Sequence, residues 1–300
     1  MSGSESRLLD WIRQACLLEV RSEKPGNVSP THVFDNASLR DFETSARVIA
    51  PILAQAGCRT VGEAIRNAVQ ATRNAVGHNT NLGIVLLLAP LSAVPLSTSL
   101  SEGIETILRD LTVSDAVAVY EAINIAAPAG LGTAEAQDVA DIPSVNLREC
   151  MRLAADRDQI AAEYVNGFSV ILNVGQALLE ETADWTPLHR HQRIAWVAVN
   201  LLARFGDTLI RRKCGADVDS RATTLARHAL TSGWPQTADG QRAYEKLDRF
   251  LRADGHRRNP GTTADIIAAI IFAALRSQRC FCNAEETQLL FLEESDVGPV

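Results

Sequence analysis

The sequence contains almost no alternation of β-branched and polar residues, so β-strands are not expected. It also lacks the motifs GxxxxGKS/T, GxGxxG, HExxH and GxSxG. These absences argue against P-loop nucleotide binding, dinucleotide binding, zinc proteolysis and serine hydrolysis. Basic residues are scarce too: 29 Lys and Arg stand against 36 Asp and Glu, giving a net charge of -7. This charge repels polyanions, so a nucleic-acid partner is not expected.

Long hydrophobic runs and clustered cysteines are also missing. The longest apolar run, 82–96, is too short to span a membrane and is interrupted by two prolines. The segment 1–20 has acids and arginines inside a helical pattern, which differs from a secretory signal. We therefore expect no membrane partner and a cytoplasmic protein. The closest cysteines, Cys280 and Cys282, have the wrong spacing for a structural zinc site.

Apolar residues recur at helical spacing along nearly the whole chain, which predicts an all-α protein. Because no low-complexity linker or repeat divides the chain, we expect one multi-helix bundle over residues 1–300, with an active-site mouth formed by polar inter-helix loops. The nearly all-apolar helix 262–278 should lie at its centre. Helices are expected at 5–20, 38–56, 60–75, 80–89, 99–109, 112–126, 145–156, 158–181, 187–213, 218–231, 238–253, 262–278 and 284–293.

The first polar segment, EKPGNV at 23–28, places Lys24 before a Pro-Gly turn. Such a turn can present the Lys24 ammonium and the Asn27 amide to a phosphate. An ordinary inter-helix turn with a solvated lysine is the alternative. In the following segment, Asn36 or Ser38 can cap a helix with Asp41 in its first turn. The functional interpretation is that Asp35 and Asp41 bind Mg²⁺ or accept a proton.

Four polar residues, His78-Asn79-Thr80-Asn81, precede the apolar helix that starts near 82. Their number exceeds what capping requires, and free backbone amides at a helix N-terminus favour anions. Asn79, Thr80 and Asn81 are therefore candidate ligands for a phosphate or a ribose. His78 taken alone is more typical of an ordinary hydrogen-bonding residue.

A similar arrangement precedes the helix near the other end of the chain. Thr262 or Thr263 can cap that helix, with Asp265 three residues after Thr262 as in a capping box. Alternatively, Asp265 holds a metal ion that carries a triphosphate.

Positive charge gathers in the segment RFGDTLIRRKC at 204–214. Its spacing predicts an ion pair between Asp207 and Arg211 on the helix surface. Arg211, Arg212 and Lys213 should end the helix, where they could supply the cations that a triphosphate requires.

Taken in order, these segments resemble the triphosphoribosyl-dephospho-CoA synthase family, from about residue 19 to residue 275. The family pattern is matched at Glu19, 24–26, 42–46, 79–83 and 260–265. The resemblance implies an all-helical transferase that joins ATP to 3'-dephospho-CoA and releases adenine. The triphosphoribosyl product is the precursor of the prosthetic group of citrate and malonate lyase-type acyl carrier proteins.

The resemblance also implies roles for individual residues, with ATP as a substrate and Mg²⁺ as its companion. One of Asp35, Asp41 and Asp265 would help to deprotonate the acceptor hydroxyl. The metal ligands would come from Asp35, Asp138 and Asp265. The expected ATP-binding residues are Lys24, Asn27, Asn79, Thr80, Asn81, Arg211, Lys213 and Thr262.

The chain departs from the better-known family members at two places. It has NTNLG at 79–83 instead of NTHKG, and the segment 127–141 replaces an RGEA-type segment. We interpret it as a divergent branch, in which Asp138 of the variant segment is a site candidate. Two alternatives stay open: the same transfer to another acceptor, for example in assembly of a pterin-type one-carbon cofactor, or a non-catalytic nucleotide-binding helical protein. A homodimer is one candidate assembly.

Overall fold

The computed structural model describes residues 3–34, 37–128, 136–183 and 190–277. Within these ranges the chain forms helices, and the strand-like features are two isolated bridges between residues 29 and 37. The all-α prediction is confirmed. The helices are α1 (Gly3–Arg21), α2 (Leu39–Leu53), 3-10 helix η1 (Ala56–Cys58), α3 (Val61–Val76), α4 (Leu82–Ala93), α5 (Leu100–Arg109), α6 (Val113–Ala126), α7 (Leu147–Ala154), α8 (Gln159–Val165), π-helix η2 (Val170–Gly175), α9 (Gln176–Glu181), α10 (Arg190–Phe205), α11 (Thr208–Cys214), α12 (Ala216–Thr231), α13 (Ala238–Arg252) and α14 (Gly261–Arg276).

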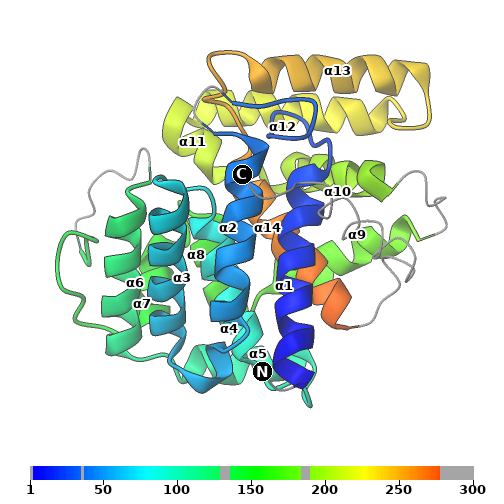
Figure 1. Ribbon diagram of the computed structural model, residues 1–300. Coiled ribbons are helices and arrows are strands. Elements are labelled where there is room, and N and C mark those ends of the chain that lie inside the picture. Colours follow the sequence, from blue (N-terminus) through cyan, green and yellow to red (C-terminus); the bar gives the residue numbers. More distant parts are fainter. Residues whose placement is uncertain (1–2, 35–36, 129–135, 184–189, 278–300) are drawn as a thin grey trace, which may run out of the picture.

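Helix α14 lies at the centre of the molecule, as its apolar sequence predicts. Every residue from 266 to 274 is buried, because α1, α4 and the π-helix pack around it. Figure 1 shows α14 passing behind the upright helices α1 and α2. None of the described helices combines the length and the apolarity needed to span a bilayer.

A second, smaller core joins α10 to the helix pair α12 and α13. Val199 and Leu202 of α10 pack there with Ala226 of α12 and Leu247 of α13. Trp196 contacts both this core and the main one. The α12–α13 pair consequently lies across the top of the upright helices in Figure 1, next to α11.

Two predicted helices are each divided in the structure. The predicted helix 187–213 is broken at Gly206, whose φ of 70° ends α10. The predicted helix 158–181 is broken at Gly167 and Phe168, which also have positive φ. Left-handed backbone cannot continue an α-helix. Apolar spacing carries on across both breaks, so periodicity alone does not reveal them. The predicted helix 284–293 lies outside the described residues.

Candidate active site

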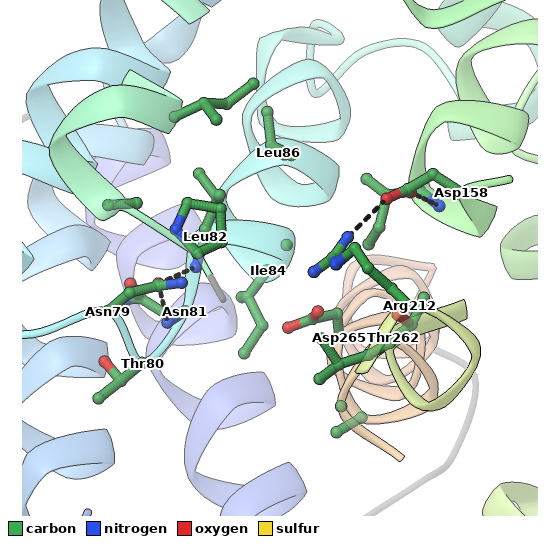
Figure 2. A pocket seen from close by; sticks show the side chains of 18 of the residues that line it. Asn79, Thr80, Asn81, Leu82, Ile84, Leu86, Asp158, Arg212, Thr262 and Asp265 are labelled. Carbon is green, nitrogen blue, oxygen red and sulfur yellow. Dashed lines mark hydrogen bonds and ion pairs between the residues drawn. The ribbon is translucent and has the colours of Figure 1, made fainter. Parts of the chain in front are cut away.

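Several helix ends converge on one cavity of about 1180 Å³. The N-terminal residues of α4, α8 and α14 and the C-terminal residues of α11 line it. In Figure 2, Asn81 and Ile84 at the start of α4 lie across the cavity from Asp265 and Arg212. The N-terminal end of a helix carries partial positive charge, so this arrangement suits a negatively charged ligand.

The polar residues before α4 have three different roles. The Asn79 side-chain oxygen accepts hydrogen bonds from the Asn81 and Leu82 amides, at 3.2 and 3.0 Å, and so caps the helix. The Thr80 hydroxyl bonds to the Ser45 hydroxyl of α2. Asn81 is only 5% exposed, and its side-chain Nδ2 has no hydrogen-bond partner although the residue lines the cavity. A buried, unpaired donor at a cavity wall indicates a place for a ligand acceptor.

Asp265 of α14 reaches across to the N-terminus of α4. A Cβ atom at Gly83 would lie 2.1 Å from Asp265 Oδ2, so only glycine permits this approach. Burial raises the pKa of the Asp265 carboxyl well above its ordinary value, and the neighbouring carboxylate of Glu19 raises it further. A hydrogen bond from the Ile84 amide acts in the opposite direction. Figure 2 shows the carboxyl group directed into the cavity.

The predicted capping box of α14 is wrong, because Asp207 does the capping. The Asp207 Oδ2 atom accepts bonds from the Thr263 amide and hydroxyl, both at 2.8 Å. Its Oδ1 atom caps α11 by accepting from the Leu209 and Ile210 amides. Asp265 is thereby left to face the cavity.

The predicted ion pair between Asp207 and Arg211 is also absent. Asp207 is fully buried at the break between α10 and α11, where it caps two helices. Arg211 pairs instead with Asp219 of α12, at 2.9 Å. The turn at Gly206 is the physical reason, since it moves Asp207 from the helix interior to the N-cap of α11.

Four basic side chains form one side of the cavity, which we call the cationic wall: Arg211, Arg212, Lys213 and Arg257. The first three end α11, as predicted, where the helix dipole favours cations. Arg212 contacts Asp158 at 3.4 Å, and Lys213 donates to Asn259 at 3.2 Å. Burial lowers the pKa of Lys213, and the charge of Arg212 adds to this effect. A bound polyanion would relieve the repulsion between these cations.

Lys24 does not line the cavity. It is completely buried, and its ammonium lies 3.0 Å from the Glu19 carboxylate and 3.0 Å from the Ser22 carbonyl. Glu19 is the member of this pair that lines the cavity. Asn27, from the same segment, also lines it; this residue is 6% exposed, and its side-chain Nδ2 has no hydrogen-bond partner.

The remaining predicted site residues are divided between the cavity and the surface. Thr262 lines the cavity and accepts a hydrogen bond from the Thr208 hydroxyl. Asp138 lines it as well, and its Oδ1 accepts from the Ala140 amide at 2.9 Å. Asp41 does not line it; its carboxylate accepts from the Ser38 amide and closes the capping box of α2. Asp35 lies outside the described residues.

The structure adds residues that the sequence did not single out. Asp158 caps α8 through the Ile160 amide and contacts Arg212. His256 and Phe34 line the cavity with ring centroids 4.5 Å apart, and the His256 Nδ1 atom is buried without a hydrogen-bond partner. Arg257 and His256 belong to the polar connection before α14, and the polarity of this connection is the sequence feature that could have identified them.

Comparisons with known proteins identify the family of the chain. Residues 5–280 match the family described as ATP:dephospho-CoA triphosphoribosyl transferase. A crystal structure from Archaeoglobus fulgidus, of a protein proposed to be a triphosphoribosyl-dephospho-CoA synthase, superposes with a TM-score of 0.61 at 26% identity. The match covers 77% of this chain and 96% of that one. A search of curated proteins gave no significant match. The chain therefore belongs to the ATP:dephospho-CoA triphosphoribosyl transferase family.

Proposed function

We propose that the protein transfers the triphosphoribosyl group of ATP to an acceptor hydroxyl, that of 3'-dephospho-CoA in the family, and releases adenine. One observation supports this most directly: the cationic wall and the Asp265 carboxyl border the same cavity. The wall would bind the triphosphate, and the carboxyl would lie at the reacting ribose. The unpaired side-chain nitrogens of Asn27 and Asn81 supply further donors for ribose or phosphate oxygens.

Asp265 would act as the proton acceptor in this reaction. Its raised pKa makes the Asp265 carboxylate a stronger base toward the proton of the acceptor hydroxyl. The acceptor oxygen then forms a bond to C1' as the bond from C1' to adenine N9 breaks, with oxocarbenium-like charge on the sugar. The electron pair of the broken bond leaves with adenine. The proton held by Asp265 passes to adenine, which leaves as the neutral base.

Mg²⁺ fits this site only as a companion of the nucleotide. No group of three His, Cys, Asp or Glu that could hold a metal occurs in the described part of the chain. Magnesium bound with phosphates needs only one or two protein carboxylates, and both Asp265 and Asp158 line the cavity. When bound, the ion would neutralise phosphate charge. Asp138 lines the same cavity, so its role as a metal ligand stays a prediction.

Chromatography of the products formed from ATP, Mg²⁺ and 3'-dephospho-CoA tests the proposal. We expect adenine and a triphosphoribosylated acceptor, with no product when the metal is chelated. Asp265→Asn should lower kcat by about 100-fold or more. Asp41→Asn is the matched control, because Asp41 carries the same charge outside the cavity. Formation of ADP or AMP without adenine would contradict the proposal.

A further inference from the structure

The cavity has a second side whose chemistry differs from that of the cationic wall. We call it the α6–α7 wall: Val119, Tyr120, Ile123, Ala126, Gln137, Asp138, Val139, Leu147, Cys150, Met151, Leu153 and Ala154. Most of these side chains are apolar. Asp138 is the acid among them, and Arg157, which also lines the cavity, follows α7. Burial raises the pKa of Tyr120, the charge of Asp138 raises it further and the charge of Arg157 lowers it, so an acid and a base both lie near this wall.

The loop that carries Asp138 is attached to α6 before any ligand arrives. The Tyr120 hydroxyl donates to the Gln137 carbonyl at 2.6 Å, and Asn124 donates to the Val139 carbonyl at 2.9 Å. These two bonds flank Asp138 on both sides along the chain. Gln137 also exchanges two bonds of 2.9 Å with Ser144. The Asp138 position is therefore preorganised, which reduces the entropy lost on binding.

The size of the cavity leaves room for more than one ligand. Sites for single drug-sized ligands occupy roughly 300–1,000 Å³, and this cavity measures about 1180 Å³. A triphosphate on the cationic wall would leave the α6–α7 wall available to another chemical group. Offsetting charges give that wall little attraction for a phosphate, whereas its apolar side chains favour a flat, uncharged surface.

We propose that the α6–α7 wall binds an uncharged heteroaromatic ring, with apolar side chains against its face and the Asp138 carboxylate accepting from an N–H group on its edge. This inference rests on the proposed function, which places the triphosphate and ribose on the other side. Met151 and Leu153 of α7 and Ile123 of α6 contribute apolar surface for the ring. The ring belongs either to the adenine of ATP or to the acceptor.

Calorimetric titrations of wild type and Asp138→Asn distinguish the two sources. If the ring is adenine, the variant should bind ATP at least about tenfold more weakly and bind inorganic tripolyphosphate as wild type does. If the ring belongs to the acceptor, ATP binding is unchanged. In that case 3'-dephospho-CoA, titrated in saturating tripolyphosphate, binds at least about tenfold more weakly.

Asp141→Asn provides the matched control. Asp141 carries the same charge on the same loop, but it is exposed and does not line the cavity. This control should bind all three probes as wild type does. The inference is overturned if Asp138→Asn leaves ATP and 3'-dephospho-CoA binding unchanged, or if it weakens tripolyphosphate binding as much as ATP binding. Because binding is measured without turnover, wild type that fails to release adenine would refute the proposed reaction and leave this result standing.

Discussion

Gly83→Ala should displace the Asp265 carboxyl in the candidate active site. The new methyl group would lie 2.1 Å from Asp265 Oδ2 and 2.5 Å from its Cγ atom. The nearest other atom is Ile160 Cδ1 at 3.0 Å, so the Asp265 carboxyl takes most of the clash. We expect this carboxyl to rotate away from the start of α4 and to lose its hydrogen bond from the Ile84 amide.

The stability change combines one stabilising and two destabilising contributions. Alanine is favoured over glycine within a helix by about 1 kcal/mol. Overpacking costs about 1–3 kcal/mol, and a lost hydrogen bond to a charged group costs about 1.5–3 kcal/mol. The variant should therefore be destabilised by about 1.5–5 kcal/mol. For catalysis the displacement matters more, because misplacing a reacting group by about 1 Å can lower the rate roughly 100-fold.

Adenine release from ATP gives kcat, and urea unfolding gives the stability. Gly57→Ala is the matched control, since a methyl group there meets only the Ala93 carbonyl at 3.9 Å. It should keep wild-type kcat. Combining Gly83→Ala with Asp265→Asn should cost little more activity than Asp265→Asn alone, because both changes remove the same group. A Gly83→Ala variant with wild-type kcat would refute the placement of Asp265.

Three further predictions concern buried charge and phosphate binding. Lys24→Met should lower the free energy of unfolding by about 3–5 kcal/mol by leaving Glu19 unpaired; unchanged stability in urea would contradict this. Burial raises the pKa of the Glu163 carboxyl from 4.5 to about 7, so the folded state binds this proton more tightly than the unfolded state. The stability that the bound proton contributes therefore decreases as the pH rises from 4.5 to 7. Relative to Glu163→Gln, wild type should lose about 3 kcal/mol of unfolding free energy between pH 4.5 and 7. A stability difference between the two proteins that stays constant with pH in urea titrations would contradict the raised pKa of Glu163. Lys213→Met should weaken tripolyphosphate binding about tenfold in calorimetry, whereas Lys246→Met, outside the cavity, should not; equal effects would refute the cationic wall.

The fold brings most of the predicted ATP-binding residues to one cavity. Asn27, Asn79, Thr80, Asn81, Arg211, Lys213 and Thr262 all line the cavity, although their binding roles stay predictions. These residues sit in polar segments between apolar helices, where sequence gives a direct signal. Lys24 is the exception, because the same segment folds back and buries the ammonium against Glu19.

The sequence could not distinguish the carboxylates that cap helices from those that face the cavity. Asp41 lies in the first turn of α2, and the sequence pattern also predicted a capping-box position for Asp265, so a capping role fitted both residues equally well. The structure gives that role to Asp41 in α2, whereas in α14 Asp207 provides it from a distant position. Spacing within a helix cannot report a cap that comes from another part of the chain.

Sequence by itself determined the helical class, the central position of the apolar helix α14 and the order of the polar segments, because periodicity and turn residues are local properties. Tertiary structure alone decided which of these segments meet and which charges stay accessible. Gly206 ends α10, which places Asp207 where its carboxylate caps α14. Gly83 has no side chain, which leaves the space that the Asp265 carboxyl occupies. Both outcomes depend on contacts between residues far apart in the chain, so close packing, and not local preference, selected them.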